Sequence, residues 1–264
     1  MGEIIALHSY RGGTGKTNVT TSLAVRLAAQ GYQVGVVDID IQSPGIHALF
    51  DLDPSEFKAT LNDVLWGRTR MLDAVHDVTN RVRSADGERA LDGDGAVFLV
   101  PSSIDAADIA RIIKEGYEVE DLNTALIAFL EDQGLDYLIL DTHPGLSQEA
   151  LLAMALSDVL IVMLRPDKQD YQGTAVTLDV AHRLAVPQVF LALNKVLLTE
   201  DDEALTLEVE SAYDVPVAAV IPLDETVVRL GSTGVFAAMF PDSTVTGALD
   251  QLRNKLVNNT APAD

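Results

Sequence analysis

The chain reads His8-Ser9-Tyr10-Arg11-Gly12-Gly13-Thr14-Gly15-Lys16-Thr17 between an apolar run at 4–7 and a segment of helical period at 17–30. A strand, a glycine-rich loop and a helix in this order form a phosphate-binding site. Glycines let the backbone N–H groups turn inward, and the helix N-terminus adds partial positive charge. We expect Lys16 to reach the β and γ phosphates of a nucleotide and the Thr17 hydroxyl to ligate Mg²⁺.

Apolar runs recur along the chain, and most are separated by segments of helical period. Continuous runs, rather than alternation, are typical of strands buried on both faces of a parallel sheet. We therefore predict a single-domain α/β P-loop fold, with a mostly parallel, twisted sheet of seven or eight strands and helices on both faces. The expected strands are 4–7, 34–37, 97–100, 137–140, 159–162, 189–192 and 217–220, and the expected helices are 17–30, 104–114, 122–133, 147–156, 171–185, 202–213 and 244–257.

The sequence predicts one domain over residues 1–257, followed by a polar, disordered tail at 258–264. The helix at 244–257 carries an apolar stripe that is expected to pack on the domain rather than enter lipid. The least regular stretch, 66–95, mixes basic and acidic residues. It is expected to be a solvated excursion, and the alternative is an arm that binds a partner.

Composition narrows the possible functions. The 264 residues include 18 Lys and Arg, 40 Asp and Glu, and no cysteine, for a net charge of −22. The missing cysteines exclude disulfides, thiolate metal sites and a cysteine nucleophile. The negative charge disfavours non-specific binding to DNA and to anionic membranes. The N-terminal residues do not resemble a signal peptide and no apolar run is long enough to span a bilayer, so the cytoplasm is the expected compartment.

Three acidic residues follow predicted strands. Asp38 and Asp40 are alternate residues at the end of the second strand, so both side chains can face the same site. Alternatively, they cap the next helix. Asp141 ends the run at 137–140, as in a Walker B element, and is expected to hold Mg²⁺ through water. His143 follows it closely, and a structural role is expected for this side chain rather than metal binding.

The loop Tyr10–Thr17 resembles the deviant Walker A loop, x-K-G-G-x-x-K-[ST], of the MinD/ParA family of ATPases, since Tyr10 stands where the strict motif has glycine. The resemblance implies binding of ATP or ADP with Mg²⁺ and a homodimer in the ATP state. In the family, an early lysine of the loop reaches the partner's phosphates. Here Arg11 takes that position and keeps the charge. The alternative is that Arg11 is satisfied within its own subunit.

The same resemblance extends to other segments. It implies that Asp38 supports Mg²⁺ or Lys16, that Asp40 orients the attacking water, and that the Gly145 N–H approaches the γ-phosphate. It also assigns Asn194 to the edge of the adenine. A guanine-binding N-K-x-D motif would need Asp at Leu197, which weakens a GTPase interpretation. The full expected set is Lys16, Asp40 and Arg11 for catalysis, Thr17, Asp38 and Asp141 for metal, and Gly12, Gly13, Thr14, Gly15, Lys16, Thr17, Asn18, Gly145, Asn194, Pro222 and Asp224 for the nucleotide.

The predicted function is an ATPase switch that dimerises on ATP and positions or regulates a protein partner. Members of related families that use thiolates for iron–sulfur or metal chemistry are disfavoured, because the chain has no cysteine. Two alternatives remain open at this point. One is an ATP-dependent ligase or synthetase of the dethiobiotin or cobyric-acid type, and the other is a nucleotide-binding regulator with negligible turnover.

Overall fold

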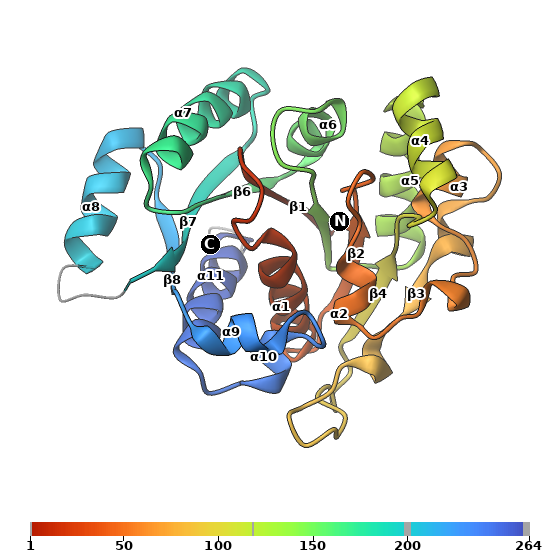
Figure 1. Ribbon diagram of the computed structural model, residues 1–264, viewed down its shortest axis with the longest axis horizontal. Helices are drawn as coiled ribbons and strands as arrows, with labels where there is room; N and C mark the ends of the chain where they lie inside the picture. The colour runs from red at the N-terminus through yellow and green to blue at the C-terminus, as the bar shows by residue number, and fades with distance from the viewer. Residues whose placement is uncertain (1, 118, 198–201, 261–264) are drawn as a thin grey trace.

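An eight-stranded sheet crosses the molecule with helices on both faces (Figure 1). The computed structural model describes residues 2–117, 119–197 and 202–260. The strand order is β3-β4-β2-β5-β1-β6-β7-β8, and all neighbours are parallel except β3 and β4. The strands are β1 (Glu3–His8), β2 (Gln33–Asp38), β3 (His76–Asp77), β4 (Ala96–Val100), β5 (Tyr137–Asp141), β6 (Val159–Leu164), β7 (Gln188–Val196) and β8 (Val217–Pro222).

The helices form one layer on each face of this sheet. One layer contains α1 (Lys16–Ala28), α2 (Ile46–Leu49), α9 (Glu225–Leu230), α10 (Phe236–Met239) and α11 (Thr244–Thr260). The other contains α3 (Leu61–Leu65), α4 (Ala106–Glu115), α5 (Val119–Asp132), α6 (Gln148–Leu156), α7 (Lys168–Arg183) and α8 (Asp202–Tyr213). Short 3₁₀ turns lie at η1 (Pro54–Glu56), η2 (Met71–Ala74) and η3 (Thr79–Arg81).

Alternate residues of each central strand pack into two separate hydrophobic cores, one on each face of the sheet. In β1, Ile5 and Leu7 pack into the core that includes α1 and α11, whereas Ile4 and Ala6 pack into the core on the opposite face. Burial of both faces explains why the strands read as unbroken apolar runs. Because β1, β2, β5 and β7 are parallel, their carboxyl ends share one edge, where ligands of open α/β sheets bind.

All seven predicted strands are confirmed, and β3 adds a short eighth strand at the edge. The predicted helices are confirmed with small shifts at their ends. In α11, the stripe of Leu249, Leu252 and Leu256 is buried in the core beside α1, so this helix packs on the domain as expected. None of the helices in the described ranges combines the length and the apolar character needed to cross a bilayer.

Two expectations need correction. The segment 66–95 is not simply a solvated excursion, because Val78, Val82 and Leu91 are at most 2% exposed and join the core beside β4. The predicted tail starts too early at 258, since the helix that buries Leu252 and Leu256 continues to Thr260. The rest of the predicted tail, 261–264, lies outside the described residues.

Candidate nucleotide site

The loop between β1 and α1 forms one wall of a cavity of about 680 Å³ at the carboxyl edge of the sheet. Gly13 and Gly15 have φ angles of 76° and 92°, which is the left-handed region that favours glycine. Lys16 begins α1 and is only 7% exposed. The cavity is also lined by residues from the loops after β2 and β5, namely Asp40, Ser43, Gly45, His143 and Pro144.

A buried carboxylate lies under the first turn of α1. Asp141, at the end of β5, accepts a hydrogen bond from Thr17 Oγ1 at 2.8 Å and one from Thr20 Oγ1 at 3.1 Å. Burial raises the pKa of Asp141 to about 6, against the opposing effects of the Lys16 charge and the two threonine hydroxyls. This cluster of hydroxyl and carboxylate oxygens next to a lysine is typical of a site for a hard cation and phosphate.

Asp38 lies beside Asp141, in register on the neighbouring strand β2. Its Oδ2 accepts hydrogen bonds from the backbone N–H groups of Gly45 and Ile46 at 3.0 and 3.2 Å. Its Oδ1 accepts from the Asp40 N–H at 3.2 Å. Burial, followed by the charge of Asp141, raises the pKa of Asp38. The buried Asp38 carboxylate therefore holds both ends of the loop 40–45 by hydrogen bonds to its backbone. We call this loop the first switch segment.

Asp40 connects this first switch segment to the loop after β5. Its Oδ1 accepts a hydrogen bond from the Ser43 N–H at 3.0 Å and lies 2.7 Å from His143 Nδ1. His143 belongs to residues 142–146, which we call the second switch segment. The cavity wall thus holds a carboxylate that is tied to both segments.

The second switch segment is also tied to the phosphate loop. The Gly145 N–H donates to the Ser9 carbonyl at 3.0 Å, and Gly145 has a φ of 83°. His8 Nδ1 lies 2.8 Å from Thr142 Oγ1, which itself donates to the Leu7 carbonyl. Because that hydroxyl proton is used, His8 Nδ1 carries the hydrogen in this contact. Burial, assisted by the charge of Lys16, lowers the pKa of His8 to about 3.

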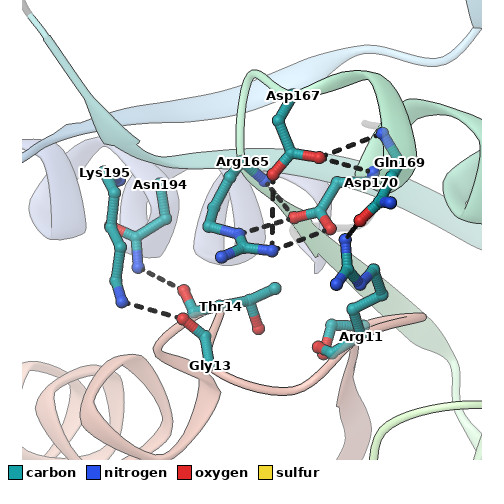
Figure 2. A network of polar contacts seen from close by, with 10 residues as sticks. Arg11, Gly13, Thr14, Arg165, Asp167, Gln169, Asp170, Asn194 and Lys195 are labelled. Atoms are coloured by element: carbon teal, nitrogen blue, oxygen red, sulfur yellow. Dashed lines mark hydrogen bonds and ion pairs between the residues drawn. The ribbon is translucent and has the colours of Figure 1, made fainter.

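The end of β7 fastens the loop from its other side (Figure 2). Asn194 Nδ2 donates to the Thr14 carbonyl at 2.6 Å, and Lys195 Nζ donates to the Gly13 carbonyl at 2.8 Å. A Cβ on Gly15 would lie 2.5 Å from Asn194 Nδ2, so only glycine allows this close approach. Lys195 has a φ of 59°, which is uncommon for a residue with a side chain.

A second cavity, of about 270 Å³, adjoins the first and shares Gly15, Asn18 and Ser232 with it. Asn194 and Pro222 line it, and so does Asp224, whose carboxylate also caps α9 by accepting from the Thr226 N–H at 2.6 Å. Its remaining walls are mostly apolar, with Ile221, Leu223, Val227, Val228, Phe236, Val245 and Leu249 among them. An apolar cavity next to a phosphate loop has the character required for a flat nucleobase.

The two residues that make the loop unusual both lie against α7. Arg11 Nη1 donates to Gln169 Oε1, as Figure 2 shows. The Tyr10 ring packs on Gly173, where a Cβ would overlap it. Nearby, Arg165 is paired with Asp170 at 2.8 Å. Arg11 is exposed, and its hydrogen bond to Gln169 lies within this chain.

With this geometry established, comparisons with known proteins identify the family. Residues 2–186 match a family model described as an AAA domain. The solved structure of the septum site-determining protein MinD with Mg-ADP from Pyrococcus horikoshii covers 99% of this chain and 98% of its own, with a TM-score of 0.78 and 24% identity. The chain belongs to the MinD/ParA family of P-loop ATPases.

Two other relatives show how far the similarity to family members extends. An uncharacterized ATP-binding protein of Methanocaldococcus jannaschii is 28% identical over 97% of this chain and 88% of its own length. The septum site-determining protein MinD of Neisseria meningitidis is 30% identical over 63% of this chain. That match spans 55% of the Neisseria protein, so the two are similar over only part of their lengths.

The site fits the Mg²⁺-nucleotide that this family implies. Thr14 Oγ1 is buried in the phosphate loop and has no hydrogen-bond partner among the described residues. Two buried carboxylates, Asp38 and Asp141, lie side by side on adjacent strands. Mg²⁺ prefers oxygen ligands and is usually held by one or two carboxylates together with phosphate oxygens. Thr17 and Asp141 provide such oxygens at the N-terminus of α1.

The structure brings most of the predicted residues together. Gly12–Asn18 and Asp40 line the first cavity, with Asp38 and Asp141 beneath it, while Asn194, Pro222 and Asp224 line the second. The Arg11 side chain instead contacts Gln169 of α7, and the Gly145 N–H donates to the Ser9 carbonyl.

Sequence reasoning missed other contributors, namely Thr20, Lys195, Gly173 and the contact of His143 with Asp40. Of these, Thr20 could have been found, since it follows Thr17 by one helical turn.

Proposed function

We propose that this chain hydrolyses ATP with Mg²⁺, forms a homodimer in the ATP-bound state and, in that state, acts on a protein partner. The observation that carries the proposal is the hydrogen bond from Thr17 to Asp141 beneath a loop whose lysine, Lys16, is buried. This arrangement supplies positive charge, backbone donors and metal ligands at one point, which is what phosphoryl transfer requires.

Each residue of the first cavity has a role in this proposal. Lys16 and the N–H groups of the loop bind the phosphates, and Thr17 and Asp141 hold the metal, with Asp38 behind them. Mg²⁺ supplies neutralisation of the charge that develops on the phosphate oxygens. Asp40 lies in the cavity wall, where it would orient the attacking water.

The proposed nucleotide base is adenine, bound in the second cavity. The side chain of Asn194 donates to Thr14 and its Oδ1 accepts from the Lys195 N–H at 2.8 Å, so it fastens the loop that borders this cavity. One amide hydrogen and one lone pair remain for the base edge. Pro222 supplies an apolar contact, and Leu197 occupies the position where a guanine-binding motif would have an aspartate.

For dimerisation, we propose that Arg11 leaves Gln169 and contacts the phosphates of the second subunit. Arginine suits this role because its planar guanidinium donates several hydrogen bonds to phosphate oxygens. The side chain is exposed, and its hydrogen-bond partner on α7, Gln169, is neutral. The net charge of −22 favours a protein as the partner over DNA or anionic lipid.

Light scattering with the Asp40→Ala variant tests the dimer. With ATP and Mg²⁺ this variant should retain the nucleotide and have twice the monomer mass. The double variant with Asp40→Ala and Arg11→Ala should be monomeric under the same conditions. A matched control, Gln169→Ala, removes the contact with α7 but keeps the guanidinium, and should still dimerise.

An Asp40→Ala protein that binds ATP and stays monomeric would overturn the dimer model. Turnover separates the two other functions. Bound ATP without phosphate release, even when cell extract is added, would favour a regulator. ADP release that requires a small carboxylic acid would favour a ligase.

A further inference from the structure

The contact between Asp40 and His143 joins two segments that are 103 residues apart in the sequence. Asp40 lies in the first switch segment and His143 in the second, and both line the cavity that contains Lys16 and Thr17. The side chains are only 15% and 27% exposed. The pair therefore lies in the wall of this cavity, where the two segments meet.

The chemistry of the contact fixes its direction. An ionised carboxylate can only accept, so Nδ1 of His143 carries the hydrogen and donates to Asp40 Oδ1 at 2.7 Å. The Ser43 N–H donates to the same oxygen at 3.0 Å. Within the part of the chain that the structure describes, both side-chain hydrogen bonds of Asp40 thus fall on Oδ1. Oδ2 keeps its lone pairs for another donor.

We propose that His143 is a positioning residue for ATP hydrolysis, which holds the Asp40 carboxylate so that Oδ2 orients the attacking water. The inference rests on the proposed function, since it assigns the water-orienting role to Asp40. The Ser43 N–H comes from the same segment as Asp40 and cannot tie it to the rest of the site. His143 supplies that tie, because it projects from the loop after β5, the strand that ends in Asp141.

Two substitutions of His143 distinguish a role as hydrogen-bond donor to Asp40 from a role in packing alone. His143→Asn places an amide N–H close to where Nδ1 stands, whereas His143→Gln places its amide near the position of Nε2. We expect the Gln variant to lower kcat roughly 10- to 100-fold, because a small misplacement of a reacting group has effects of this size. The Asn variant should recover most of the loss. ATP affinity should stay within about twofold of wild type in both, because the change affects kcat rather than ground-state binding.

A double-mutant cycle tests whether His143 acts through Asp40. Asp40→Ala combined with His143→Gln should be no slower than Asp40→Ala alone. Thermal melts of each variant report on folding independently of activity. Equal loss in the Asn and Gln variants, or additive losses in the double variant, would overturn the inference while leaving the proposed ATPase intact. A wild-type protein that binds ATP and releases no phosphate would remove the proposed function, and the inference with it.

Discussion

At each end of the parallel strands, burial raises the pKa of a carboxyl group, but the surroundings of the two groups differ. At the carboxyl edge, Asp141 receives two threonine hydroxyls and lies near Lys16. At the amino edge, Glu3 begins β1 beside Asp158, next to a cavity of about 590 Å³. Burial, and then the like charge of Asp158, raises the pKa of Glu3 to about 7. Glu3 Oε2 is buried and has no hydrogen-bond partner among the described residues.

The two edges differ in the number of hydrogen-bond donors that surround their carboxyl groups. Both edges impose a desolvation cost on a carboxylate, and both raise its pKa. At the carboxyl edge, several donors bond each of the two buried acids: the backbone N–H groups of Gly45 and Ile46 donate to Asp38, and hydroxyls of α1 donate to Asp141. Because buried acids with convergent donors are typical of functional sites, we expect the chemistry of this protein at the carboxyl edge.

Removal of the main positive charge should have the largest effect. Lys16→Ala is expected to lower kcat/KM for ATP hydrolysis at least about 100-fold, because preorganised charge at the transferred phosphate contributes on this scale. Steady-state phosphate release measures it. Lys195→Ala is the matched control, since Lys195 also touches the loop but donates to the Gly13 carbonyl. Equal losses in the two variants would mean that the position of the charge in the site does not matter.

The amino edge should respond in stability rather than activity. Because folding raises the pKa of Glu3, the folded protein binds more protons than the unfolded chain between about pH 4.5 and 7. The free energy of unfolding contributed by this group is therefore lost as pH rises through that window. Glu3→Gln removes the charge and should stabilise the protein by on the order of 1 to 3 kcal/mol at pH 8.5, with little gain at pH 4.5.

Urea unfolding at both pH values measures this change. Glu225→Gln, at an exposed position of α9, is the control and should leave the pH dependence as in wild type. If Glu3→Gln gives the same change in stability at pH 4.5 and pH 8.5, the amino edge does not bury a strained charge, and the contrast between the edges fails.

The smallest expected effect concerns the fastening of the loop by Asn194. Asn194→Ala removes the donor to Thr14 and should weaken ATP binding by about fivefold, since a lost hydrogen bond costs about 1 kcal/mol. Asn194→Asp keeps the acceptor for the Lys195 N–H but sets a carboxylate against the Thr14 carbonyl. Calorimetry should rank ATP affinity as wild type, then Ala, then Asp. An Asp variant that binds like wild type would show that this contact does not hold the loop.

The sequence predicts the strands and the layers because buried strands appear as continuous apolar runs. It predicts the phosphate loop because the glycines of the loop are consecutive or nearly so in the sequence. It fails where the partner comes from elsewhere in the chain. Nothing local shows that Asp38 closes on backbone N–H groups, or that His143 meets Asp40. In the segment 66–95, the buried Val78 and Val82 are scattered among charged residues, so no local pattern indicates their burial.

Gly173 sets a limit on engineering this protein for heat resistance. A glycine inside α7 is an obvious target for replacement by alanine, which would add roughly 1 kcal/mol of helix propensity. The same Cβ would displace the Tyr10 ring and, with it, the phosphate loop that Tyr10 and Arg11 anchor on α7. Gly173→Ala, chosen for helix propensity alone, would therefore disturb the phosphate loop, so this glycine should be kept in any stabilised variant.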